Sequence, residues 1–344
     1  MPHRSVEILL PPSCEASARE VLDEEPLQLL VFEVDEQRLR AQALVPTSGV
    51  ESLLDRLVGR FPGSGDLRVV VQRIEASIPA GLEETEIEDP DSKGPWIARS
   101  PRVSREELLG VVGRGSRVTD GFLVMVALST VVALIGLVRS NPGIVIGAMV
   151  IAPLLGPNMA LSLSLTLGHG RLFAQSMRAN LFGIGLALAM ALAIGPFLDL
   201  FPLNSELAAR TAIGWGDIGL ALASGAAGAL ALTAGEGMSL VGVMVAVALL
   251  PPLVTFGLCL SHGAISSAVG AAMLLLTNVI CVNLSGVATF LIRGFRPRSW
   301  WAAHHSARRS RRALTLYVVA LCAIGVYILA VQLGWLPDPS EGGS

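Results

Sequence analysis

The sequence predicts a polytopic α-helical membrane protein with a small α+β domain at its N-terminus. Of its 344 residues, 52% are hydrophobic and only 15% are charged, a balance that is unusual for a soluble protein of this size. Nearly all charged residues lie before residue 118 or in a short stretch near residue 300. The rest of the chain holds about seven apolar segments, each long enough to cross the hydrocarbon core of a bilayer.

Residues 1–78 are expected to form the α+β domain. Their hydrophobic patterns predict strands at 6–10, 27–35, 38–46 and 67–76, and helices at 14–25 and 49–61. This βαββαβ order is typical of a ferredoxin-like sandwich. The first residues contain no apolar core long enough for a secretory signal, so we expect the domain to stay in the cytosol. It has no basic patch for nucleic acid, and its fold alone leaves ligand sensing, dimerisation and scaffolding open.

Residues 79–118 are expected to connect this domain to the membrane. The stretch from Pro79 to Pro101 is acidic and contains prolines, a composition that favours a linker without a fixed structure. A short juxtamembrane helix follows. Ser104 and Glu107 have the spacing of a capping box, in which Ser104 caps the helix and Glu107 reaches back to the Ser104 amide.

The apolar segments define the expected membrane topology. We place them near residues 119–138, 142–167, 172–198, 212–233, 238–260, 264–292 and 314–335. Arginines gather before the first segment, between the second and third, and in the basic loop at 293–313. Because basic loops are retained in the cytoplasm, the N-terminus is predicted inside and the C-terminus outside, with a final helix and tail at 314–344.

Two similar stretches indicate an internal repeat. GAMVIAPLLGP starts at Gly147, and GVMVAVALLPP starts at Gly242. The same register pairs Ser129 with Ser224, and a three-residue insertion later pairs Asn180 with Asn278. We therefore interpret residues 119–198 and residues 199–292 as two copies of a unit of three membrane segments. A unit with an odd number of crossings must start reversed in its second copy, so we expect an inverted repeat with paired broken helices, the pattern of secondary transporters.

The stretches STVVALIGLVRSNPGIVIGAMVIAPLLGP, Arg-Ala-Asn-Leu and AVALLPPLVTFGL make the chain resemble a bacterial and archaeal family. This is domain of unknown function 389, the "uncharacterised hydrophobic domain" proteins, and the likeness covers about residues 104–295. The resemblance implies a protein of the prokaryotic cell (inner) membrane. The family's name records no assigned activity, so no catalytic or binding residue is carried over from it.

Candidate site residues follow from the repeat and from polar side chains in apolar segments. Broken helices leave backbone groups unpaired, and a solute could use them. In the two breaks the candidates for substrate binding are Gly147, Pro153, Gly156, Pro157, Asn158, Pro251, Pro252 and Thr255. These residues are also explained by kinks and close packing alone.

Further candidates lie outside the two breaks. Asn180, Asn278, Ser129 and Ser224 stand within apolar segments, where either solute binding or hydrogen bonding between helices would explain them. Glu236 lies near the predicted inner surface of the membrane. It is either a solvated carboxylate in a loop or a site for a proton or cation.

The predicted function is transport, or conduction through a channel, of a small polar or anionic solute, regulated by the cytosolic domain. The alternative is a membrane sensor or scaffold that moves nothing. No nucleophile with a base and no paired carboxylates are placed for catalysis, so no enzyme is expected. The four cysteines lack paired or ligand-like spacing, and we expect no disulfide, metal or cofactor. The expected partners are the lipid bilayer, the unknown solute and a second copy of the chain, but no nucleic acid.

Overall fold

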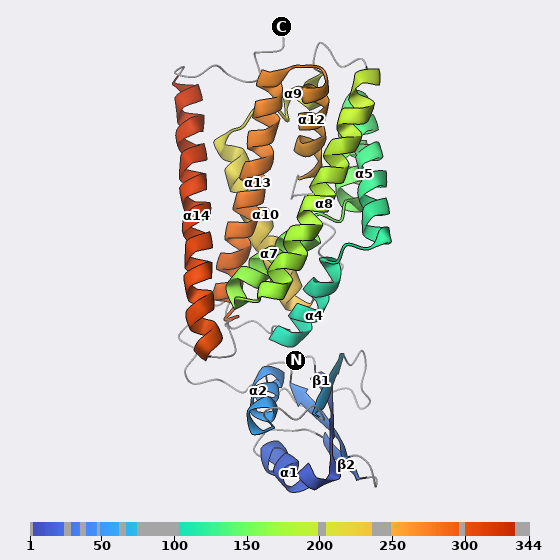
Figure 1. The fold of residues 1–344 in the computed structure, drawn as a ribbon, viewed down its shortest axis with the longest axis vertical. Coiled ribbons are helices and arrows are strands. Elements are labelled where there is room, and N and C mark those ends of the chain that lie inside the picture. The colour runs from blue at the N-terminus through green and yellow to red at the C-terminus, as the bar shows by residue number, and fades with distance from the viewer. Residues whose placement is uncertain are drawn as a thin grey trace. The chain divides into compact units, whose positions relative to one another are not determined.

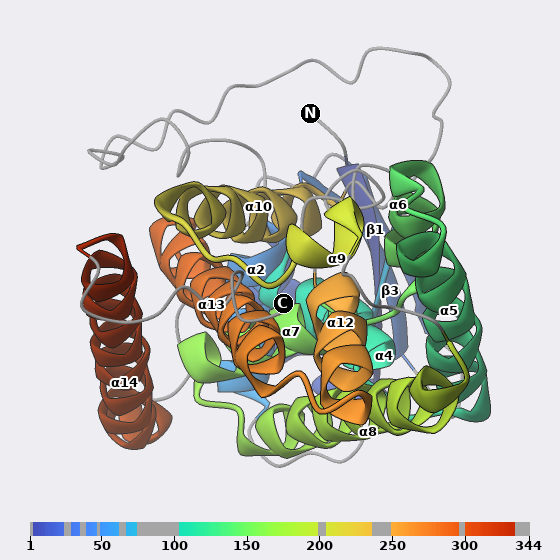
Figure 2. The same ribbon diagram turned by 90° about the horizontal axis from the view of Figure 1, so that it is seen from above.

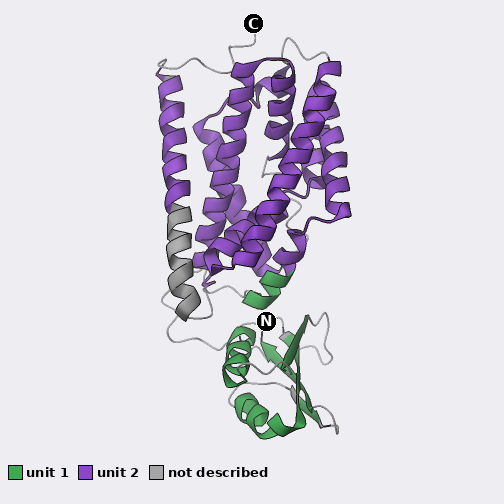
Figure 3. Ribbon diagram, viewed as in Figure 1, with its two compact units in different colours: residues 1–110 green, residues 111–344 purple. Residues whose placement is uncertain are grey.

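The computed structural model divides the chain into two compact units. The described residues are 3–23, 29–34, 39–46, 49–61, 67–73, 103–198, 204–235, 249–295 and 300–333. Unit 1 comprises residues 1–110 and unit 2 comprises residues 111–344 (Figure 3). The predicted linker from 79 to 101 lies outside the described residues.

The described residues of unit 1 up to Arg73 form a four-stranded antiparallel sheet and two α-helices in the predicted order (Figure 1). Its elements are β1 (His3–Leu10), η1 (Pro12–Cys14), α1 (Glu15–Asp23), β2 (Leu29–Val34), β3 (Leu39–Pro46), α2 (Val50–Arg60) and β4 (Arg68–Arg73). The strand order in the sheet is β2-β3-β1-β4, and each neighbouring pair is antiparallel.

The core of unit 1 lies between the sheet and its helices. Val6, Ile8 and Leu10 alternate along β1 and are buried, because every second side chain of a strand faces the same side. Leu53 and Leu57 of α2 are buried in the same cluster. The sheet therefore has one apolar face, which the two amphipathic helices cover.

Unit 2 is a helical bundle. It contains part of α4 (Arg105–Gly115), then α5 (Asp120–Val138), α6 (Pro142–Ile151), α7 (Leu155–Leu167), α8 (Gly170–Ile194), η2 (Gly195–Phe197), α9 (Ser205–Ala208), α10 (Trp215–Ala234), α12 (Leu250–Ser261), α13 (Ile265–Ile292) and α14 (Trp300–Gln332). Because α14 begins at Trp300, much of the stretch predicted as a basic loop is helical.

The helices of unit 2 are those of a membrane protein. Among the described residues, four helices are long and apolar enough to span a bilayer: α5, α8 with its extension to Phe197, α10 and α13. The bent pair α6 and α7 makes a fifth span if it is counted as one. The predicted segment 238–260 is described only from Leu249, and the apolar part of α14, Thr315–Val331, is short.

The first predicted break is present between α6 and α7. The two helices are bent by 51°. Ala152 adopts an extended conformation, with φ −65° and ψ 119°, because it precedes Pro153 and the α-helical region is disfavoured before proline. Pro153 therefore ends α6, and α7 starts anew two residues later. The corresponding stretch 242–248 in the second copy lies outside the described residues.

The two short helices α7 and α12 lie inside the bundle. Viewed from above, they are enclosed by α5, α8, α10 and α13, while α14 stands at the edge (Figure 2). Small residues make this packing possible. A Cβ added to Gly257 of α12 would lie 2.5 Å from the Cβ of Ala191 in α8, and one added to Gly286 of α13 would lie 2.9 Å from Ser162 Oγ in α7.

Substitution of Gly257 should destabilise the bundle. In Gly257→Ala the new methyl group would overlap Ala191, and overpacking of this kind costs about 1–3 kcal/mol. We expect a lower thermal unfolding midpoint for the purified protein in detergent. Gly147→Ala is the matched control, because a Cβ there meets nothing within 4 Å and alanine favours the helix. A Gly257→Ala protein as stable as the Gly147→Ala protein would contradict the packing described.

Candidate functional site

Three asparagines and one serine form a buried cluster beside the break. We call Asn158, Ser162, Asn180 and Asn283 the asparagine cluster. Asn158 and Ser162 lie on α7, Asn180 lies on α8 and Asn283 lies on α13. None of the four is more than 7% exposed. The break in the second span thus brings polar side chains from three helices to one place.

Hydrogen bonds connect all four residues. Asn158 Nδ2 donates to Asn180 Oδ1 at 3.1 Å, and Asn283 Nδ2 donates to Asn158 Oδ1 at 3.0 Å. Ser162 Oγ donates to Asn283 Oδ1 at 3.0 Å. The second amide hydrogens of Asn158 and Asn283 go to the carbonyls of Leu154 and Val279. The cluster therefore satisfies most of its polar atoms, as a low-dielectric site requires.

Asn283 was not among the predicted site residues. Its signal is the same as that of Asn180, an amide within a long apolar helix, where polar groups are costly and face the interior. Our prediction relied on matched pairs, and the residue at the equivalent position in the first copy is Gly185. A search for every amide in the apolar spans would have found Asn283.

The first turns of α7 and α12 lack side-chain caps. Helices α5, α6 and α8 are preceded by Thr119, Asn141 and His169, whose side chains accept hydrogen bonds from the backbone of the first turn. By contrast, Leu154 and Leu249 precede α7 and α12 and provide no side-chain cap. The first amides of a helix have no acceptor within it. Helices α10 and α13 also start without a hydrogen bond from a side-chain cap, so α7 and α12 share this feature with two of the outer helices.

Three of the predicted prolines start helices. Pro157 is the third residue of α7, and Pro251 and Pro252 are the second and third residues of α12. Proline is tolerated there because the amide it lacks would have had no partner in the helix. Of the prolines described, only Pro153 stands at the break itself. Pro157 and Pro252 hold the same position in their helices, as the repeat predicts.

Thr255 of α12 is completely buried, and its hydroxyl has no hydrogen-bond partner among the described residues. A threonine in a helix usually donates to the carbonyl one turn earlier, as Thr277 does to Met273 at 2.8 Å. An unpaired buried hydroxyl costs about 1–3 kcal/mol. Thr255 therefore carries a buried hydroxyl whose hydrogen-bonding capacity is unused among the described residues.

The remaining predicted site residues make no hydrogen bond to the asparagine cluster that the described residues show, or lie outside those residues. Ser129 and Ser224 donate within their own helices, to the carbonyls of Val126 and Ala221. Gly147 makes no close helix contact among the described residues. Asn278 of α13 is as buried as Asn180. Glu236 lies outside the described residues.

Gly156 does make a close approach. A Cβ added there would lie 2.7 Å from the carbonyl oxygen of Gly115, the last residue of α4. Gln175 of α8 also holds this end of α4, because its Nε2 donates to the carbonyl of Gly113 at 2.7 Å and to Ser116 Oγ at 3.0 Å. The C-terminal end of α4 is thus fixed against the first turn of α7.

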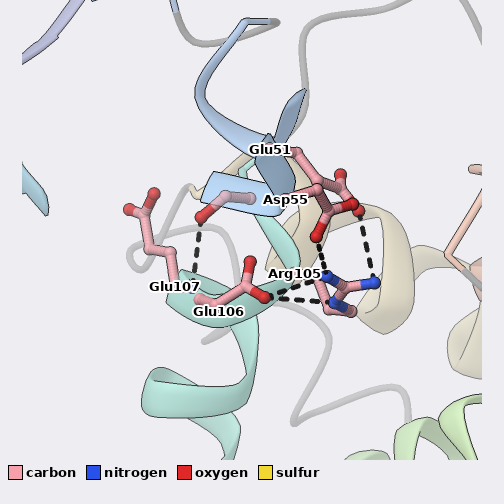
Figure 4. Close-up of polar contacts among 6 residues, drawn as sticks. Glu51, Asp55, Arg105, Glu106 and Glu107 are labelled. Carbon is pink, nitrogen blue, oxygen red and sulfur yellow. Dashed lines mark hydrogen bonds and ion pairs between the residues drawn. The ribbon is translucent and has the colours of Figure 1, made fainter. Parts of the chain in front are cut away.

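A second polar centre surrounds Arg105 at the start of α4, within unit 1 (Figure 4). Its side chain is 7% exposed and contacts Asp55 and Glu106, each at 3.0 Å, and Glu51 at 4.0 Å. Burial lowers the pKa of Arg105, but the hydrogen bond and charge of Glu106 and the charges of Asp55 and Glu51 raise it above its ordinary value. The guanidinium stays charged.

The predicted capping box is only half formed. The amide of Glu107 donates to Ser104 Oγ at 3.2 Å, as expected. The carboxylate of Glu107 does not cap the helix but accepts two hydrogen bonds from Arg4 of β1, each at 3.3 Å. The buried guanidinium of Arg4 needs a charged partner, and this requirement takes Glu107 away from the Ser104 amide.

Comparison with known proteins identifies the family. A protein-family model, the domain of unknown function DUF389, matches residues 149–284. An uncharacterised protein of the archaeon Methanocaldococcus jannaschii is 32% identical over 288 residues, covering 84% of this chain and 87% of the relative. The chain belongs to the DUF389 family. No solved structure matches it.

The region of the DUF389 match contains the asparagine cluster, Thr255 and the first residues of α7 and α12. Unit 1 and the Arg105 centre lie outside it. Among the described residues of this DUF389 protein, no group of three or more His, Cys, Asp or Glu side chains could hold a metal ion. The polar side chains of the asparagine cluster and of Thr255 are amides and hydroxyls.

Removal of the Thr255 hydroxyl should stabilise the protein in the absence of a ligand. Thr255→Val keeps the shape and removes an unpaired buried polar atom, so we expect a gain of about 1 kcal/mol in unfolding free energy. Thr277→Val is the control, because it removes a hydroxyl that is already bonded to Met273. Thermal unfolding in detergent measures both variants. Equal shifts would show that the Thr255 hydroxyl is not unpaired.

Proposed function

We propose that this DUF389 protein is a membrane transporter or channel for a small polar or anionic solute rather than an enzyme. The observation that carries the proposal is the pair of half-helix starts without caps, one beside the asparagine cluster and the other followed by the unpaired hydroxyl of Thr255. Broken helices that direct amides and dipoles inward form the solute sites of secondary transporters.

We further propose that the spans form the inverted repeat. Helices α7 and α12 begin at equivalent residues, Leu155 and Leu250. The contact between Ser162 and Gly286 recurs between the equivalent residues Gly257 and Leu188, where an added Cβ would lie 3.3 Å from Leu188 Cδ1. These features support two copies in opposite orientations.

The proposed topology has seven spans in a prokaryotic inner membrane, with the N-terminus inside and the C-terminus outside. Arginine placement supports it, since basic residues near span ends are retained in the cytoplasm. We propose that unit 1 is a cytosolic ferredoxin-like domain, which its βαββαβ order and β2-β3-β1-β4 sheet support. A homo-oligomer in the lipid bilayer remains part of the proposal.

We propose that unit 1 regulates the solute site through α4. The first turn of α4 is held in unit 1 by Arg105 and by the pair of Glu107 with Arg4. Its last residue, Gly115, lies in unit 2 against Gly156 in the first turn of α7. A ligand of unit 1 would act on the solute site through this segment of the chain.

Accessibility of the half-helix starts should distinguish transport from the alternative of a sensor or scaffold. In a cysteine-free protein in native membranes, Asn158→Cys and Thr255→Cys should react with a membrane-impermeant maleimide from at least one side, because a transport path admits water. Ser164→Cys is the control, since Ser164 is buried but bonded to its own helix. Protection of both test positions from both sides would count against transport.

Reversal of the Arg105 charge should release α4 from unit 1. Arg105→Glu would place like charges together, and we expect a loss of about 1–3 kcal/mol, between the exposed and buried limits for ion pairs. Hydrogen exchange at residues 103–110 should quicken, and the double variant with Asp55→Arg should partly restore protection. Arg19→Glu, in an exposed pair with Glu15, is the control. Unchanged exchange in Arg105→Glu would refute the proposed connection.

A further inference from the structure

Four exposed arginines of unit 2 lie around the contact between α4 and α8. We call Arg114, Arg117, Arg171 and Arg178 the arginine patch. Arg114 lies in the last turn of α4, and Arg117 follows the end of that helix. Arg171 and Arg178 lie in the first turns of α8. All four side chains are exposed.

Gln175 of α8 joins the two parts of the patch. Its Nε2 donates to the carbonyl of Gly113 and to Ser116 Oγ, and these two residues directly precede Arg114 and Arg117. The amide of Arg117 donates to the carbonyl of Arg114 at 3.3 Å, which keeps the two arginines adjacent. This pair of arginines is therefore fixed beside α8.

Arg171 and Arg178 lie on the side of α8 that carries Gln175. One is four residues before Gln175 and the other is three residues after it, and residues at these spacings are neighbours on a helix surface. The patch thus combines arginines from two segments that Gln175 connects across 62 positions of the chain.

The arginines of the patch form no ion pair within the part of the chain that the structure describes. By contrast, Arg4 contacts Glu107 at 3.3 Å, and Arg105 contacts Asp55 at 3.0 Å. Neighbouring like charges repel one another, and a fixed group of them attracts a partner of the opposite charge. The patch therefore fits an anionic partner.

The patch lies where membrane spans begin. Span α5 starts at Asp120, soon after Arg117. Helix α8 with its extension has 28 residues and is about 42 Å long, so it exceeds a hydrocarbon core of about 30 Å by about 12 Å. Its charged residues are Arg171 and Arg178, and charge in hydrocarbon is costly, so the excess length belongs at this end. Phe173, which is 38% exposed, lies between them.

We infer that the arginine patch binds the headgroups of anionic phospholipids. A guanidinium group donates two parallel hydrogen bonds to a phosphate, and the lipid surface supplies phosphates at the depth where the first turns of α8 lie. The exposed ring of Phe173 suits the same boundary between headgroups and acyl chains. Basic groups beside a membrane span are attracted to anionic lipids in this way. The inference is independent of the proposed transport.

The test measures lipid binding by the purified full-length protein in a neutral detergent. Dioleoyl phosphatidylglycerol is added in increasing amounts, and the thermal unfolding midpoint is followed. We expect a saturable rise that weakens with added salt, because salt screens exposed charges. Dioleoyl phosphatidylcholine, which has no net charge, should give a much smaller rise. Glycerol 3-phosphate at the same concentration should give none, since the site requires a headgroup held at the membrane surface.

Two double variants assign the site. Arg114→Gln with Arg117→Gln, and Arg171→Gln with Arg178→Gln, each remove two charges. We expect the affinity for phosphatidylglycerol to fall tenfold or more in each, because one basic residue near an anionic surface contributes about fivefold. The four side chains are exposed, so the midpoint without lipid should change little.

Arg68→Gln with Arg139→Gln is the matched control. It removes two exposed arginines, one on β4 of unit 1 and the other at the opposite end of α5. Weakened lipid binding in both patch variants, with wild-type binding in the control, supports the inference. Wild-type affinity in either patch variant would overturn it. So would an equal loss in the control, or an equal rise with phosphatidylcholine or glycerol 3-phosphate.

Discussion

The structure depends on how polar groups are satisfied where a membrane span is interrupted. Pro153 ends α6, and α7 starts at a new angle of 51° within an apolar bundle. Backbone groups released in such surroundings need partners from protein, water or a ligand. Asn158 supplies one partner by donating to the carbonyl of Leu154, and Asn283 holds Asn158 in place. The asparagine cluster is thus part of the break, and the break gives the cluster its position.

Close packing around the short helices explains how such a polar interior is kept. The short helices α7 and α12 contact the long helices α13 and α8 at Gly286 and Gly257, where the glycine leaves room for the side chains of Ser162 and Ala191 on the facing helix. Small residues at helix contacts let dispersion forces act over a short distance, which matters in a bilayer where burial of apolar groups gives no driving force between helices. The contact of Gly115 with Gly156 follows the same rule at the end of α4.

Much of this architecture could be predicted from the sequence, because its signals are local. Alternating hydrophobic residues identified the strands of unit 1, and long apolar runs identified α5, α8, α10 and α13. Pro153 marked the break, and Pro157 and Pro252 marked equivalent positions in two helices. Ser104 was correctly placed as a helix cap. Each of these features is determined by residues that lie close together in the sequence, so the sequence pattern alone predicts it.

The site itself depends on contacts between distant residues, which the pattern of a single chain does not give. Asn283 meets Asn158 across 125 positions, and its counterpart in the repeat is glycine, so the symmetry that pointed to Asn180 and Asn278 passed it over. Glu107 has the spacing of a capping residue, yet Arg4, 103 positions away, binds its carboxylate. In both cases a buried polar side chain, Asn158 or Arg4, forms its hydrogen bonds with a residue that is distant in the sequence.

The use of amides in place of charged residues has a physical consequence for any solute bound here. A buried lysine or arginine would hold an anion strongly, and it would leave an uncompensated charge when the anion departs, at a cost of several kcal/mol. Asparagine donors and helix ends carry partial charges, so the empty and occupied states differ less in energy. A site that must bind and release its solute benefits from this small difference. The buried Arg293 illustrates the contrast, because it caps the end of α13 and donates to Thr233 at 3.1 Å, outside the asparagine cluster.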